Sequence, residues 1–344
     1  KELELGIEGK FLKNRVGIDI SAYTKDSEDL IIDLELDQST GYSSSTVNSA
    51  SINNKGIEAI INVVPVQSRD FTWEITGQFS KLKSEVLSIA DGISKVYVAG
   101  YTGRGNIAIP GMPFGIMEGS TISRDYGSLD GLDVTQVHSD DRLNYTPFLD
   151  ANGGYTYLGT GMIGDPQPDF VYGVTNTLSY KWATIRVQFD HQVGGDMFTT
   201  TVSTMTGRGI LGNTGFDRFV PVITSGLKLD GTPYTKQTTA NQHYWPNTGV
   251  FYDEQSVYDA STMRLREISL SLVAPKSFLN GTPFGNASLT LSAQNIWHLA
   301  YNTPKDSNFD PEVSSYGTGN NVRGFDEMTG PTAKKYGATL SLTF

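Results

Sequence analysis

Two residue patterns in this 344-residue chain invite a chemical interpretation, and the first is a glycine-rich run. Residues 159–164 read G-T-G-M-I-G, which satisfies the dinucleotide fingerprint G-x-G-x-x-G. That fingerprint needs a helix to begin directly after it, whereas residues 165–168 read D-P-Q-P and cannot open one. We therefore expect no dinucleotide site, and no other motif calls for a cofactor.

The second pattern is an acidic run that starts like a calcium-binding loop at Asp306. Its sixth place is Pro311 and its twelfth is Gly317, where an EF-hand loop needs glycine and glutamate. A looser cation site formed by Asp306, Asp310 and Glu312 is the weaker hypothesis. An ordinary loop held by Asx turns is the stronger one.

Nothing else in the sequence predicts an enzyme. The four histidines are far apart, without H-E-x-x-H spacing, and no G-x-S-x-G nucleophile elbow occurs. The absence of cysteine excludes disulfides, thiolate metal ligands and thiol catalysis. A net charge of −11 argues against a nucleic-acid partner, because phosphate binding requires clustered Lys and Arg.

Aromatic residues in the two longest expected loops are the remaining ligand candidates. These are Tyr155 and Tyr157 in one loop, and Tyr244 and Trp245 in the other. Their flat rings could stack on a sugar or on another amphipathic ligand. Alternatively, they pack the loops together or belong to an aromatic girdle, and the sequence leaves both interpretations open.

The segments that must position these loops show alternating hydrophobicity. In residues 336–344 the even positions are apolar or aromatic and the odd ones small or polar, and residues 3–7, 71–79, 183–190 and 287–294 repeat the pattern. The strands to which these runs belong are about ten residues long, the length that a tilted strand needs to cross the hydrocarbon layer. One face of such a strand meets lipid and the other a wet lumen.

The pattern predicts eleven strands joined by connections that alternate between short and long. The strands are expected near residues 1–11, 15–24, 55–64, 70–80, 95–103, 111–119, 170–181, 183–193, 263–273, 286–297 and 335–344. Outer-membrane barrels have short periplasmic turns and long outer loops, so the alternation places the C-terminus in the periplasm.

Composition supports a membrane β-barrel and excludes some of the other classes of protein. Mean hydropathy is −0.26, and no apolar run approaches the roughly 18 residues of a membrane helix, which excludes a helical membrane protein. Thirty-seven Gly, 17 Tyr and 16 Phe suit a barrel with many turns and aromatic girdles, although a soluble β-sandwich could share them. Residues 1–11 already read as a strand rather than a signal peptide, so we expect the chain to be a fragment.

A series of short motifs resembles the SusC/RagA class of TonB-dependent outer-membrane transporters of Bacteroidetes, from one end of the chain to the other. The matching segments are residues 14–23 (NRVGIDISAY), 54–58 (NKGIE), 164–170 (GDPQPDF), 192–198 (QVGGDMF), 258–270 (YDASTMRLREISL), 293–297 (AQNIW), 310–312 (DPE) and the terminal strand 336–344. The order of these motifs is more specific than any one of them.

The resemblance implies an all-β fold, a transmembrane antiparallel β-barrel of about 22 strands with long extracellular loops. Residues 1–344 would be its C-terminal half, about 11 strands, with the plug domain and N-terminal strands absent from this chain. The partners it implies are a SusD-like surface lipoprotein, TonB acting through the absent N-terminal part, the N-terminal half of the same transporter, and outer-membrane lipid.

The function expected from the resemblance is active import of a large nutrient across the outer membrane, with an oligosaccharide favoured as ligand. A peptide importer of the same family is the nearest alternative. A passive porin or adhesin barrel and a secreted β-sandwich lectin or glycosidase are alternatives from other classes.

Overall fold

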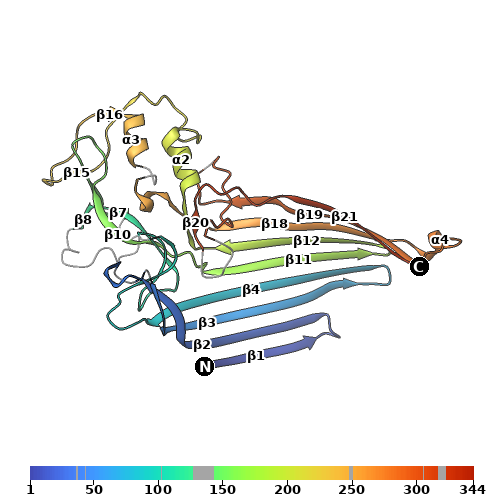
Figure 1. Cartoon of the computed structure of the whole chain (residues 1–344). Helices are drawn as coiled ribbons and strands as arrows, with labels where there is room; N and C mark the ends of the chain where they lie inside the picture. Colours follow the sequence, from blue (N-terminus) through green and yellow to red (C-terminus); the bar gives the residue numbers. More distant parts are fainter. Residues whose placement is uncertain are drawn as a thin grey trace.

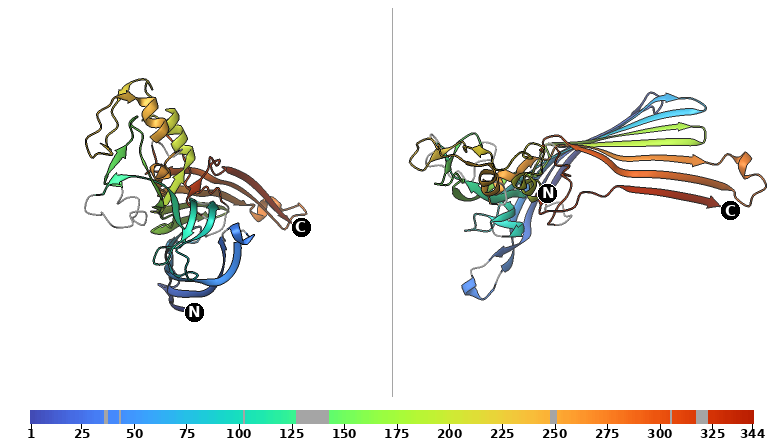
Figure 2. Two further views of the ribbon diagram at one scale, coloured as in Figure 1. Left: turned by 60° about the vertical axis from the view of Figure 1, so that its left-hand side comes forward. Right: turned by 90° about the horizontal axis from the view of Figure 1, so that it is seen from above.

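The structure is a computed structural model that describes residues 1–35, 38–42, 44–101, 103–126, 143–247, 251–304, 306–316 and 323–344. Its principal element is a curved antiparallel sheet of nine strands, with a loop cap at one end (Figures 1 and 2). In spatial order the strands are β1 (Glu2–Phe11), β2 (Val16–Glu35), β3 (Ser44–Gln67), β4 (Phe71–Ser88), β11 (Phe170–Tyr180), β12 (Ala183–Val193), β18 (Thr262–Val273), β19 (Asn286–Ala300) and β21 (Lys335–Thr343). Spatial order follows chain order throughout, as in an up-and-down sheet.

The short connections all lie at the end of the sheet opposite the cap (Figure 1). Residues 12–15, 68–70 and 181–182 close three tight turns, and residues 274–285, with the one-turn helix α4 (Lys276–Leu279), close the fourth. Lys181 takes a φ of 50° in the two-residue β11–β12 turn, the left-handed conformation that matches the twist of such hairpins. The short connections predicted after residues 11, 64, 180 and 273 are thus found together at one end of the sheet, whereas most of the predicted long loop 25–54 is strand.

One face of the sheet is apolar and the other polar. Side chains alternate along each strand, and the register pairs apolar residues with apolar ones and polar residues with polar ones. Ile185, Leu270, Leu291 and Ala338 are paired in sequence across four strands on the outer face. The adjacent row, on the inner face, is polar throughout: Thr184, Ser271, Thr290 and Thr339. Ile185 and Leu291 each remain 45% exposed, so the outer face is an unshielded apolar surface, as lipid contact requires.

This arrangement contradicts the β-sandwich alternative. A sandwich buries its apolar face against a second sheet, whereas among the described residues no second sheet covers the apolar outer face of the nine strands. Within the same part of the chain, no helix is long and apolar enough to cross a membrane.

The cap is a compact unit with its own hydrophobic core. Its largest sheet has four strands, β5 (Val96–Tyr101), β6 (Arg104–Ala108), β7 (Ile116–Ile122) and β10 (Tyr157–Gly164). Three small sheets contain β8 (Arg124–Asp125), β9 (Thr146–Leu149), β13 (Asp196–Thr199), β14 (Pro221–Val222), β15 (Leu227–Lys228), β16 (Thr238–Thr239), β17 (Val257–Asp259) and β20 (Phe325–Asp326). Its helices are α2 (Thr200–Arg208), α3 (Ala240–Asn247) and η4 (Asp253–Ser256), whereas η1 (Gln38–Thr40) lies in the connection between β2 and β3. Met117, Ile163, Phe198 and Phe325 form one buried cluster at its centre. The loops therefore fold as a domain does, by burying apolar side chains.

The expected count of eleven membrane strands is wrong. Strands do form near residues 95–103 and 111–119, as β5 and β7, but they pair within the cap. β7 is buried on both faces at nearly every residue, so it lacks the alternation that lipid on one side and water on the other would impose. Nine is odd like eleven, so the first and last strands still run in the same direction.

Strands β2, β3 and β4 extend further than predicted, toward the cap. Their added segments pair with one another beyond the last contact with β11, which is the Val171–Ser80 pair. Ala50 and Val86 of this ribbon pack against Val96 and Ala108 of the four-stranded sheet. Packing against the cap explains why segments with a weak alternating pattern are ordered as strands.

The opposite chemistry of neighbouring positions can be tested by placing the same charge on each face. Leu291→Arg puts a guanidinium on the outer face, and we expect it to reduce folding stability in lipid vesicles by about 2–4 kcal/mol. Ser292→Arg, one residue away on the inner face, should change it by less than about 1 kcal/mol. Urea titration of vesicle-reconstituted protein measures both, and equal losses would contradict the assignment of faces.

Candidate ligand-binding surface on the inner face of the sheet

Five neighbouring strands meet on the inner face near the cap, and four of them contribute polar side chains there. Register aligns Asp19 of β2, Ile60 of β3, Gln78 of β4, Gly173 of β11 and Asp190 of β12 in one row. A second row, one pleat closer to the cap, contains Ser21, Glu58 and Ser80. Residues that are more than 150 positions apart in the sequence thus share one surface.

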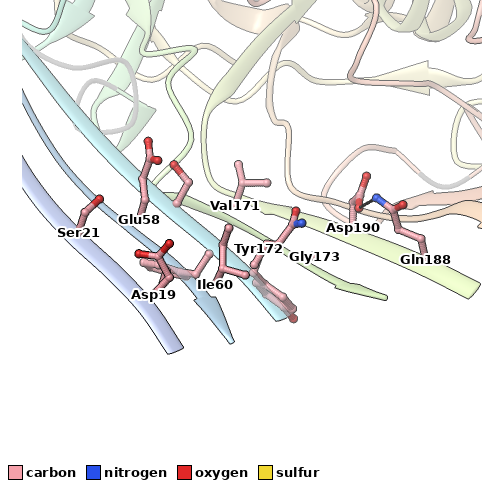
Figure 3. Close-up of a pocket in the computed structure, with 13 residues that line it drawn as sticks. Asp19, Ser21, Glu58, Ile60, Val171, Tyr172, Gly173, Gln188 and Asp190 are labelled. Carbon is pink, nitrogen blue, oxygen red and sulfur yellow. Dashed lines mark hydrogen bonds between the residues drawn. The ribbon is translucent and has the colours of Figure 1, made fainter. Parts of the chain in front are cut away.

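These rows line a hollow of about 550 Å³ (Figure 3). Gly173 forms part of its floor, and a Cβ there would lie only 3.2 Å from the Asp190 carboxylate. Asp190 accepts a hydrogen bond of 3.2 Å from the Gln188 amide, the contact drawn in Figure 3. Glycine at position 173 therefore leaves room for the carboxylate at the bottom of the hollow.

The two sides of the hollow differ in charge. On the β2–β3 side, Asp19 and Glu58 have no ion-pair partner among the described residues. On the β12 side, Asp190 is bound by the Arg266 guanidinium at 2.5 Å. The free carboxylates can accept hydrogen bonds from hydroxyl, amide or ammonium groups of a ligand.

An ion-pair network connects this hollow to the loop that follows β19. Arg266 binds both Asp190 of β12 and Glu312 of the loop, and its contact with Glu312 Oε2 is 3.0 Å. Arg264, two residues earlier in β18, binds Asp310 and lies 3.3 Å from Glu312. Arg264 and Asp310 are each only 2% exposed, so their charges depend on each other.

The Asp310 carboxyl remains ionised under all ordinary conditions. Burial by itself would raise its pKa, but hydrogen bonds from Arg264 and from the Thr332 backbone N–H outweigh burial and lower the pKa to about 2. A depressed carboxyl pKa stabilises the fold above the ordinary value of 3.8, and this contribution is lost as the pH falls toward 2. The ion pair between Asp310 and Arg264 is therefore kept at neutral pH.

The hypothesis of a cation site at Asp306, Asp310 and Glu312 is not supported. Arginine guanidinium groups occupy the carboxylates of Asp310 and Glu312, and Asp306 lies apart from them, against Gly212. Over the described ranges, no three His, Asp or Glu side chains gather as a metal site would need. The acidic loop acts as the counter-charge for two arginines of the neighbouring strand.

The four aromatic candidates lie in the cap and none lines the hollow. The Tyr155 ring packs edge-on against Tyr252 with centroids 6.2 Å apart. Tyr244 lies beneath the Arg218 guanidinium at 5.0 Å, and Trp245 beneath that of Arg208 at 5.1 Å. Tyr157, at the start of β10, is 59% exposed. Tyr244 and Trp245 are neighbours on α3, whereas Tyr155 lies in the connection before β10 and Tyr157 is the first residue of that strand.

Sequence reasoning missed the residues of the hollow, although part of the signal was present. The alternating pattern already puts Asp19 and Asp190 on the polar side of their strands. It does not say that they stand in one row, because that depends on how five strands are aligned with one another. The partner of Asp190, Arg266, lies at a bulge between Leu265 and Glu267 that no sequence pattern announced.

Comparison with known proteins finds similar sequences among TonB-dependent receptors. No family model matches. TonB-dependent receptor P3 of Formosa agariphila is 27% identical over 361 residues, covering 100% of this chain and 34% of the receptor. TonB-dependent receptor SusC of Bacteroides thetaiotaomicron is 22% identical, covering 98% of this chain and 31% of its own length. The chain thus spans about a third of the length of the curated relatives it matches.

Solved structures give the same fold. The RagAB peptide importer in its closed-closed state superposes with a TM-score of 0.66 at 18% sequence identity, covering 100% of this chain and 35% of the other. The resemblance to the SusC/RagA class, the antiparallel barrel fold and the outer-membrane location are confirmed.

The buried ion pair provides a direct test of how the loop is held. Asp310→Asn leaves the Arg264 charge buried without its principal partner, and we expect a local loss of about 3–5 kcal/mol. Hydrogen exchange should then accelerate in residues 306–316 and stay unchanged in the β19–β21 hairpin. Glu312→Gln, whose side chain is 37% exposed, is the matched control and should cost about 1 kcal/mol or less. Equal exchange in Asp310→Asn and wild type would show that this pair does not hold the loop.

Proposed function

We propose, from its homology with SusC-type TonB-dependent receptors over its whole length, that this chain forms the C-terminal part of the barrel of an active outer-membrane importer. The observation that carries the proposal is the end-to-end match to these receptors by a chain whose sheet is apolar outside and polar inside. Two open sheet edges, β1 and β21, support the same view, because unpaired strand edges are not tolerated in lipid. Further strands and a plug domain of the same transporter would complete the barrel.

In this proposal the cap captures a ligand and the inner face of the sheet passes it inward. TonB would act on the plug rather than on residues 1–344. The ion-pair network supports a link between capture and passage, since Arg266 joins the loop after β19 to Asp190 in the hollow. A movement of the loop at Glu312 would therefore displace Arg266 and change its contact with Asp190 on the lumen wall.

A SusD-like surface lipoprotein is the proposed lid over the cap. Five large apolar side chains are exposed within one short stretch of the cap: Ile210 (64%), Phe216 (42%), Phe219 (80%), Ile223 (57%) and Leu229 (73%). Apolar groups concentrated in this way mark contact surfaces. Because they lie at the end of the molecule away from the short turns, they suit a partner on the cell surface (Figure 1).

An oligosaccharide is the first candidate for the ligand. Its many hydroxyl groups would donate hydrogen bonds to Asp19 and Glu58, while the amide of Gln78 can both donate and accept. The aromatic side chains of the cap supply apolar faces for sugar rings. A peptide is the second candidate, favoured by the fold likeness to the RagAB peptide importer and by carboxylates that would suit an ammonium group.

A paired substitution in the hollow tests its role and the ligand class together. We expect Asp19→Asn with Glu58→Gln to weaken oligosaccharide binding at least about tenfold, because charged hydrogen-bond acceptors are replaced by neutral ones. Calorimetry on the outer-membrane protein, with a panel of oligosaccharides and a panel of peptides, measures the change. Glu85→Gln, on the outer face, is the control. If only peptide binding weakens, an oligosaccharide is not the ligand of the hollow. If neither peptide nor oligosaccharide binding weakens, the hollow is not a ligand-binding site.

The aromatic pair on α3 gives an independent prediction. We expect Tyr244→Ala with Trp245→Ala to weaken ligand capture about tenfold or more, since a stacked aromatic contact is lost, without disturbing barrel assembly. Phe251→Ala, an exposed ring of the same cap outside the proposed lid surface, is the control for ligand binding. Unchanged affinity in the double variant would show that the two rings have only a structural role, packing against Arg208 and Arg218.

A further inference from the structure

The outer face of the sheet carries an aromatic girdle that marks one edge of the lipid layer. Phe79, Phe170, Tyr172, His191 and Tyr301 form a continuous line of rings with successive centroids 5.7, 6.4, 5.0 and 5.8 Å apart. His191 is hydrogen-bonded on both ring nitrogens, to the Tyr172 and Tyr301 hydroxyls at 2.8 and 3.0 Å. Aromatic side chains with polar groups concentrate at membrane interfaces, so this line lies at headgroup level on the cap side.

Three lysines lie just beyond this girdle on the same outer face. Lys81 and Lys83 follow Phe79 on β4 at two-residue intervals, so their Cα atoms lie about 7 and 14 Å further toward the cap. Lys55 of β3 is directly opposite Lys83 in the ladder, and Ile57 is opposite Lys81. All three lysines are exposed, and none has a salt bridge within the part of the chain that the structure describes.

An apolar groove begins beside these lysines and crosses four strands. Leu3 and Leu5 of β1, Ala22 of β2 and Ile57 of β3 line it, together with the aliphatic stems of the lysines, and its volume is about 530 Å³. Register places Leu5, Ala22, Ile57 and Lys81 in one row across the sheet. A lysine in this row can bury its methylene chain in the groove and raise its ammonium group toward the headgroups.

The placement of the lysines is unfavourable unless an anion lies between them. Like charges directly opposite each other on neighbouring strands destabilise a sheet, and Lys55 and Lys83 are such a pair. The acidic residues of this face, Asp26 and Glu85, lie one step further toward the cap, where Asp26 already accepts a hydrogen bond from Asn53. Three ammonium groups beside an apolar groove, in the same two rows of the sheet, fit an amphiphile whose phosphate groups meet the lysines and whose acyl chain lies along the groove.

We propose that this surface, formed by Leu3, Leu5, Ile57, Lys55, Lys81 and Lys83, binds the phosphorylated, multiply acylated glycolipid of the outer leaflet. The lysines bind its phosphates and the groove receives one of its acyl chains. The proposal rests on the outer-membrane location of the protein and not on its import activity or its ligand. It gives the barrel a bound lipid at the position where β2, β3 and β4 leave the membrane to support the cap.

The test measures binding of purified lipid A to the outer-membrane protein in mild detergent by native mass spectrometry. We expect bisphosphorylated lipid A to bind more tightly than its dephosphorylated form. The triple variant Lys55→Gln, Lys81→Gln, Lys83→Gln should lose about a hundredfold in affinity for the bisphosphorylated form, because each basic residue near a lipid phosphate contributes about a factor of five. Heat-modifiable mobility on gels confirms that the variant barrel is folded.

The matched control removes the same three charges at the other end of the sheet. Lys13→Gln, Lys181→Gln, Lys276→Gln lies on the short turns and should leave lipid A binding unchanged. Equal weakening in both triple variants, or none in the first, would overturn the proposal. Competition by inorganic phosphate at the concentration of lipid A would identify a free phosphate site and would also overturn it.

Discussion

The structure depends on one constraint, that every backbone amide and carbonyl in a lipid layer must be hydrogen-bonded within the protein. A continuous antiparallel sheet meets it, and because side chains in a strand alternate, the sheet must have two faces. The rows led by Ile185 and Thr184 show the result, one apolar and one polar, one residue apart. The outer surface, the lumen wall and the hollow all follow from that alternation.

The same alternation explains how strands β2, β3 and β4 carry opposite charges on opposite sides. Asp19 and Glu58 point into the hollow, whereas Lys55 and Lys81 point outward. A register slip of one residue would exchange these sets, putting carboxylates against lipid phosphates. Pairing across these long strands is therefore a functional as well as a structural requirement, and the contact of Ala50 and Val86 with the cap adds a second constraint on it.

The cap is attached by buried charge as well as by apolar packing. Replacing a buried ion pair by apolar residues is often neutral or favourable, so Arg264 and Asp310 are better understood as defining where the loop sits than as adding net stability. The pair fixes the loop beside Arg266, whose guanidinium reaches the lumen wall at Asp190. Capture by the cap and passage along the sheet would then share one set of contacts.

The sequence by itself determined the strands of the membrane layer, because each reports its two solvents residue by residue. Strands such as β12 (Ala183–Val193) lie where the alternation predicts them, and the motif order predicts the likeness to TonB-dependent receptors that the comparisons find. Only the tertiary structure decided that β5 and β7 belong to the cap, that Asp19 and Asp190 share a row, and that Asp310 serves Arg264 rather than a cation. These features depend on which distant segments pair and in what register. The alternation within one strand does not specify its partner strand, so the sequence pattern could not predict them.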